Sequence, residues 1–132
     1  MAMQMMLVTI AMLVLFQVKH FVADYLLQPG WMLRGKGDVR RAGGYVHAAI
    51  HAVGSLPALL IAGPGASLMA ALVVAEFAVH YMIDFSKASL STRSLSGPDT
   101  QAYWTLHGAD QLMHQMTYAG LILAAQVMDI PA

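Results

Sequence analysis

The sequence predicts an all-α integral membrane protein, a single domain (residues 1–132) in which a four-helix bundle crosses the bilayer up-down-up-down. Composition is the first reason, because 58% of the 132 residues are hydrophobic and only 11% are charged. An ordinary soluble domain has about a quarter charged residues. Mean hydropathy is +0.61. The second reason is a series of apolar segments close to the roughly 20 residues that a helix needs to cross a bilayer. We expect spans at about residues 2–28, 44–62, 66–86 and 101–127.

The composition also excludes several kinds of function. Lys and Arg together number 7, as do Asp and Glu, so no basic excess indicates a nucleic-acid partner. The chain has no cysteine, which excludes disulfides, thiolate zinc sites and iron–sulfur clusters. Any metal site must therefore use nitrogen and oxygen ligands.

The first expected span ends at Pro29-Gly30, a pair that stops helices. We interpret it as a retained span rather than a cleaved signal peptide. No basic residue precedes Lys19, and no small-x-small cleavage site follows a short apolar core. The last third of the span carries polar residues at helical spacing, which places them on one face. They are Gln17, His20, Asp24 and Gln28.

The second expected span carries two histidines, His47 and His51, one helical turn apart near its start. Pro57 should kink this helix. Small residues spaced four apart lie beside the histidines and would let a neighbouring helix approach closely. The turn at residues 62–65 is rich in glycine and proline, so the second and third spans should be antiparallel neighbours.

The third and fourth spans each carry ionisable groups on a helical face. Glu76, His80 and Asp84 follow one another at i, i+4 and i+8 in the third span. Such groups are costly inside a membrane and usually face partners or water within a bundle. The corresponding residues near the start of the fourth span are His107, Asp110, Gln111 and His114.

The connecting segments predict the orientation of the helices. The segment at residues 31–43 contains four basic side chains, and Lys87 and Arg93 follow the third span. Basic loops stay in the cytoplasm, so we expect a protein of the bacterial inner membrane with both termini outside. The basic residues of the first loop are Arg34, Lys36, Arg40 and Arg41.

This topology brings the polar faces to one depth. By the helical rise, most of the histidines and aspartates lie about 5 to 13 Å inside the cytoplasmic end of their spans. Imidazole and carboxylate on facing helices are suitable ligands for Zn²⁺, Mn²⁺ or Fe²⁺. We expect one or two such ions. The predicted ligands are His20, His47, His51, His80, Asp84, Asp110 and His114.

The spacing of these residues resembles that of domain-of-unknown-function family 3307, a family of small bacterial membrane proteins. The similarity covers nearly the whole chain and implies an integral membrane protein without an established activity. A looser similarity, to inner-membrane metal-dependent hydrolases, suggests only a reaction class. The segments that carry the family resemblance are His20-x3-Asp24-x3-Gln28, His47-x3-His51, His80-x3-Asp84 with Lys87, and Asp110-Gln111-x2-His114.

Three functions are compatible with this pattern. The first is a metal-dependent hydrolase for an anionic phosphoester or a lipid-like substrate, with Asp24, Glu76 and Lys87 as catalytic groups. The second is a transporter or a proton or metal-ion pathway. The third is a structural or assembly protein, in which the polar layer only joins helices. The expected partners are the lipid bilayer, a small substrate and a second copy of the chain in a homodimer.

Glu76 lies deeper than the other acidic residues, where the bundle should be apolar. We therefore expect it to be a neutral carboxylic acid that donates to a backbone carbonyl. On that interpretation, Glu76→Gln keeps the metal and most of the thermal stability, whereas Asp84→Asn loses the metal.

Overall fold

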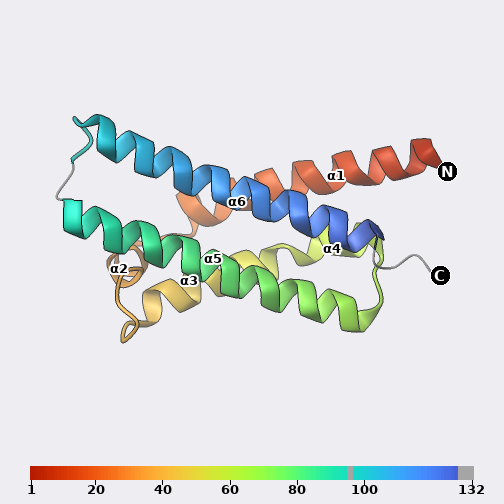
Figure 1. The fold of residues 1–132 in the computed structure, drawn as a ribbon. Helices are drawn as coiled ribbons and strands as arrows, with labels where there is room; N and C mark the ends of the chain where they lie inside the picture. Colours follow the sequence, from red (N-terminus) through yellow and green to blue (C-terminus); the bar gives the residue numbers. More distant parts are fainter. Residues whose placement is uncertain (95–96, 128–132) are drawn as a thin grey trace.

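The computed structural model describes residues 1–94 and 97–127, and within these ranges the chain is helical without strands (Figure 1). The all-α prediction is therefore confirmed. The C-terminal end, residues 128–132, which we expect outside the membrane, lies beyond the described residues. The elements are α1 (Ala2–Phe21), the π-helical turn η1 (Val22–Leu26), α2 (Gly30–Gly35), α3 (Ala42–Gly54), α4 (Leu56–Ala62), α5 (Ala66–Ser94) and α6 (Gln101–Val127).

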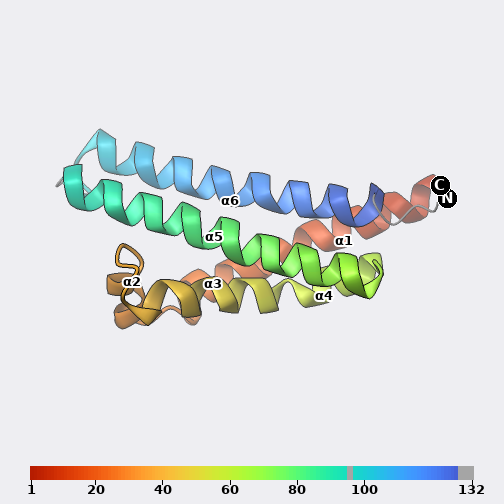
Figure 2. The same cartoon turned by 60° about the horizontal axis from the view of Figure 1, so that its bottom comes forward.

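The long helices lie side by side and form a ring of neighbours. α1 packs against α6 and α4, α3 packs against α5, and α5 packs against α6. Figures 1 and 2 show α2, the C-terminal end of α5 and the start of α6 together at one end of the molecule, the α2 end. The N-terminus and the turn between α4 and α5 lie at the other, N-terminal end.

Two helix breaks follow from local sequence. The second expected span is divided at Ser55, and Pro57 lies in the first turn of α4, where its missing N–H costs no helical hydrogen bond. Gly63 ends α4 with φ 70°, a left-handed conformation that favours glycine. The chain then reverses into α5, which packs against α3 as the tight turn predicts.

Helix boundaries differ from the expected spans in two places. The segment at residues 31–43, expected to be a loop, contains the short helix α2. α5 continues to Ser94 rather than ending near residue 86. Within the described residues, three helical stretches are long and apolar enough to cross a membrane: Ala2–Leu26, Ala42–Ala62 and Ala66–Arg93. α6 is not among them, because polar side chains are spread over its first half.

α2 is held against the start of α3 by a close backbone contact. A Cβ added at Gly43 would lie 2.8 Å from the carbonyl oxygen of Met32, so only glycine allows this approach. Lys36 follows directly after α2 and its side chain turns back toward α5. The glycine contact therefore positions a charged side chain that the site uses.

The interior changes character along its length. Toward the N-terminal end it is an apolar core of buried residues: Met12, Phe16, Ala58, Leu59, Leu72, Tyr118, Leu121, Ile122 and Ala125. Toward the α2 end the buried side chains are histidines and carboxylates. The outer surfaces are largely apolar, with Leu7, Val14 and Phe21 on α1 and Met82 on α5 all exposed. At the α2 end, polar side chains inside an apolar exterior reverse the usual pattern of a soluble domain.

Candidate metal centre

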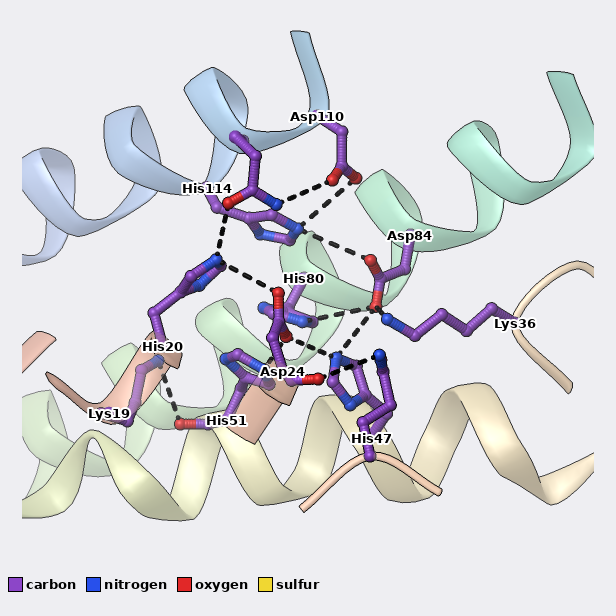
Figure 3. Close-up of polar contacts among 12 residues, drawn as sticks. Lys19, His20, Asp24, Lys36, His47, His51, His80, Asp84, Asp110 and His114 are labelled. Atoms are coloured by element: carbon purple, nitrogen blue, oxygen red, sulfur yellow. Dashed lines mark hydrogen bonds and ion pairs between the residues drawn. The ribbon is translucent and has the colours of Figure 1, made fainter. Parts of the chain in front are cut away.

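The histidines and aspartates of the four long segments meet in one layer (Figure 3). His47 and His51 are 0% exposed, His80 1% and His114 2%. All seven predicted ligands and Asp24 take part in this layer. Because buried polar groups are stable only with partners, the contacts inside the layer decide what it can bind.

Asp24 is the centre of the first group of contacts. Its Oδ1 lies 3.0 Å from Nε2 of His51 and 3.2 Å from Nε2 of His47, and its Oδ2 lies 3.3 Å from Nε2 of His20. Asp24 lies in η1, where the Leu27 N–H bonds the Val22 carbonyl five residues earlier at 3.0 Å. Such wide turns are frequent at functional sites because they change the direction of a side chain.

Asp84 is the centre of the second group. Its Oδ2 lies 3.4 Å from Nε2 of both His47 and His80, and its Oδ1 lies 3.6 Å from Nε2 of His114. Lys36 Nζ forms an ion pair with the same Oδ2 at 2.9 Å. The two carboxylates thus share His47, and each is surrounded by three imidazoles.

Several of these separations match metal ligation better than hydrogen bonding. Ligand atoms bound tetrahedrally at about 2.0–2.1 Å lie about 3.3 Å from one another, whereas hydrogen bonds of this type are usually about 2.9 Å long. Among the described residues, Nε2 of His47, Nε2 of His80 and Oδ1 of Asp110 are buried without a hydrogen-bond partner. A cation held by His47, His51 and His80 would give the two histidine nitrogens a partner.

Three groups of side chains have ligand atoms that all lie within 4.8 Å of one another: His47, His51 and His80; His20, Asp24 and His51; and His80, Asp84 and His114. Nitrogen-rich sets with one carboxylate suit Zn²⁺, Mn²⁺ or Fe²⁺. His51 and His80 each belong to two of the groups. The arrangement therefore fits one ion, or two neighbouring ions with shared ligands.

Asp110 lies at the edge of the layer. Its Oδ1 is 3.7 Å from Nε2 of His114, and its Oδ2 accepts from Lys87 Nζ at 2.9 Å. Lys87 Nζ also lies 3.2 Å from Nδ1 of His107. His107, which was not among the predicted ligands, thus contacts the site through a lysine.

The structure corrects the interpretation of Glu76. Its carboxylate pairs with Lys19 Nζ in the interior rather than donating to a backbone carbonyl. The Glu76 side chain is 0% exposed and that of Lys19 7%. Lys19 Nζ also donates to the Ser55 hydroxyl at 3.1 Å and to the His51 carbonyl at 3.3 Å. Glu76 therefore belongs to a buried ion pair next to the layer of histidines and aspartates.

Two side chains orient His20: Gln111, which belongs to the polar face expected in the fourth span, and Tyr118, which was not predicted. Nδ1 of His20 lies 2.8 Å from the Tyr118 hydroxyl, and its Nε2 lies 3.1 Å from Oε1 of Gln111. Tyr118 follows His114 by four residues, so helical spacing alone could have predicted that both side chains lie on the same face of the helix. Lys19 could also have been found, because it is the single Lys or Arg in the first two expected spans and a buried carboxylate needs a partner.

The charges in and beside the layer favour a cation. The carboxylates outnumber the lysines by one, before any histidine is protonated. A divalent ion would compensate the excess negative charge in a region where uncompensated charge is costly. The charged groups are the four carboxylates Asp24, Glu76, Asp84 and Asp110, and the three lysines Lys19, Lys36 and Lys87.

A polar cavity of about 310 Å³ opens beside the layer at the α2 end. Asp24, Asp84 and Asp110 line it, together with Lys36 and Lys87. Gln28, Tyr103, His107 and Gln111 complete much of its polar wall. The cavity therefore borders both carboxylate centres from this side.

Comparison with known proteins supports the resemblance seen in the sequence. No curated protein and no solved structure matches the chain. The family described as "Protein of unknown function (DUF3307)" matches residues 12–130, a range that contains every histidine and aspartate of the layer. The chain belongs to this family.

Proposed function

We propose that this chain is a multi-pass protein of the bacterial inner membrane, a four-helix bundle with up-down-up-down topology. The apolar outer surface and the polar interior support insertion, because lipid solvates the former and the bundle encloses the latter. α6 would be the least apolar of the four spans, and its polar face is the one that lines the metal-ligand layer. The arginines Arg34, Arg40, Arg41 and Arg93 favour a cytoplasmic α2 end.

We expect single cysteines to report this topology. A cysteine at Arg40 should react only with a reagent that crosses the inner membrane, and a cysteine at Ala2 should react with an impermeant reagent added from the periplasm. The chain has no natural cysteine, so the unmodified protein is the blank. Labelling of position 40 from the periplasm with position 2 protected would reverse the proposed orientation.

We further propose that the protein is a metal-dependent hydrolase of phosphoesters near the cytoplasmic interface. The observation that carries this proposal is the polar cavity, which joins two histidine-surrounded carboxylates to two lysines. Lysine ammonium groups bind phosphate oxygens, and the ligand sets suit a borderline divalent ion. When bound, a divalent ion would lower the pKa of a coordinated water molecule and would offset negative charge on the phosphoryl oxygens.

The chain's own residues have distinct roles in this proposal. Lys36 and Lys87 hold the phosphate, and Asp24, at the wall of the cavity, accepts the proton of the attacking water. A bond forms between the water oxygen and phosphorus as the bond from phosphorus to the ester oxygen breaks. Lys87 donates a proton to the departing alcohol. Glu76, predicted from sequence as catalytic, has only a supporting role here, because its partner is Lys19.

The transport hypothesis is less well supported. The apolar core, which includes Phe16, Leu59 and Leu121, fills the interior toward the N-terminal end. A polar path through one copy of the chain would have to cross it. A purely structural role would leave the buried ligand atoms of His47 and His80 without partners. Both alternatives remain outcomes of the following experiment.

We expect purified protein to contain at least one transition metal ion per chain by mass spectrometry and to hydrolyse a simple phosphoester such as p-nitrophenyl phosphate. Lys87→Met should lose most of this activity and keep the metal. Arg93→Met is the matched control, because Arg93 is a basic residue of α5 that does not line the cavity. Protein that contains no metal and cannot be loaded supports the structural role. Metal without hydrolysis, combined with ion flux in proteoliposomes, supports transport.

A further inference from the structure

A second hollow lies on the outer surface between α5 and α6, and its walls are much less polar than those of the polar cavity. It is a groove of about 380 Å³ with mainly apolar walls. Met82, Ile83 and Leu90 of α5 face Leu106, Ala109 and Met113 of α6 across it. Met82 is 65% exposed and Met113 52%. In a membrane this groove would open sideways into the lipid.

The groove adjoins the polar cavity. Lys87 and Asp110 line both hollows. Lys87 Nζ lies 2.9 Å from Asp110 Oδ2, so this ion pair stands at the border between the apolar groove and the charged cavity. A ligand that occupies both hollows must therefore be apolar on one side of the pair and charged on the other.

We propose that the α5–α6 groove holds one acyl chain of an anionic phospholipid, whose phosphate enters the polar cavity. This inference rests on the proposed function and names its substrate class as a membrane phospholipid. The ammonium groups of Lys36 and Lys87 in the cavity wall can bind phosphate oxygens, and a divalent ion in the layer would offset the negative charge of the three carboxylates beside them. The stretch of α5 from Val79 to Lys87 is about 12 Å long, which is enough to hold the headgroup-proximal part of an extended acyl chain. The groove thus aligns the lipid so that its headgroup meets the metal centre.

Photolabelling in bilayers tests this assignment without requiring turnover. Protein in nanodiscs of phosphatidylcholine would receive a small fraction of phosphatidic acid with a diazirine in its acyl chain, and labelled peptides would be mapped. We expect label to concentrate on residues 79–90 and 106–113 rather than on the exposed face of α1. The same photoreactive chain on phosphatidylcholine should label the lipid-facing helices evenly, because it lacks the net negative charge that the lysines attract.

Two tryptophan variants provide the matched comparison. Ala109 lines the groove, whereas Ala119 is exposed on the same helix and does not line it. Ala109→Trp should reduce groove labelling severalfold, and Ala119→Trp should leave it unchanged. Lys87→Met should also reduce labelling by phosphatidic acid. Even labelling over all helices, or equal labelling in both tryptophan variants, overturns the proposal.

The result can be separated from the test of hydrolysis. If p-nitrophenyl phosphate is hydrolysed while phosphatidic acid labels the helices evenly, the enzyme acts on a soluble phosphoester and the groove assignment fails. If label concentrates in the groove of a protein without hydrolytic activity, the lipid site stands and the proposed reaction fails.

Discussion

Asp84→Asn is expected to abolish the proposed metal binding. Asp84 contacts His47, His80 and His114, so an amide at this position removes a charged ligand from the middle of the layer. Substitutions in the outer shell of metal sites already cost about 10- to 100-fold in affinity, and the loss of a ligand should cost at least the upper end of that range.

Metal content and thermal unfolding with and without added Zn²⁺ measure this effect. A ligand that binds only the folded state at about 100 times its Kd stabilises that state by about 2.7 kcal/mol. The unmodified protein should therefore show a large rise in melting temperature on zinc addition, and Asp84→Asn should show almost none. Asp38→Asn is the control, because Asp38 is an exposed aspartate paired with Arg41. A zinc-induced rise in Asp84→Asn equal to that of the control would remove Asp84 from the ligand set.

Glu76→Gln is expected to destabilise the fold strongly, contrary to the expectation from sequence. It would leave the buried charge of Lys19 without its partner. Removing one member of a buried ion pair typically costs about 3–5 kcal/mol. Lys19→Met should cost a similar amount for the complementary reason. The double variant Lys19→Met/Glu76→Met should lose less than either single variant, because no isolated charge remains.

The free energy of unfolding in detergent micelles compares these variants. The exposed pair of Asp38 and Arg41 is the matched reference, since breaking a surface ion pair costs about 1 kcal/mol or less. The interpretation of Glu76 as a neutral acid predicts a different pattern, in which Glu76→Gln is nearly as stable as the unmodified protein. Additive losses in the double variant would likewise contradict a coupled pair.

Most of the candidate centre could be predicted from the sequence. His20 and Asp24, His47 and His51, His80 and Asp84, and Asp110 and His114 are each spaced by four residues, which determines that both members emerge on one helical face. The apolar character of the chain determines the helical class, because helices satisfy their own backbone groups where water is absent. Similar depths along antiparallel helices then predict that these pairs meet.

The contacts between the pairs required the tertiary structure. Helical spacing defines a face, but the rotation and separation of packed helices decide which atoms of facing side chains approach. Packing makes His47 the imidazole shared by Asp24 and Asp84, and η1 directs Asp24 toward α3. The close contact at Gly43 similarly holds α2 so that Lys36, which follows it, reaches Asp84.

The ion pair of Glu76 shows most clearly the difference between what helical spacing predicts and what tertiary packing decides. When each helix is considered alone, the Glu76 carboxylate lies among apolar residues, and a neutral acid is predicted. Only tertiary packing brings Lys19 of α1 to Glu76, and the same ammonium group donates to Ser55. Local spacing determined which side chains leave the backbone in the same direction. Tertiary packing determined which charges are compensated, because the cost of a buried charge depends on atoms from every helix around it.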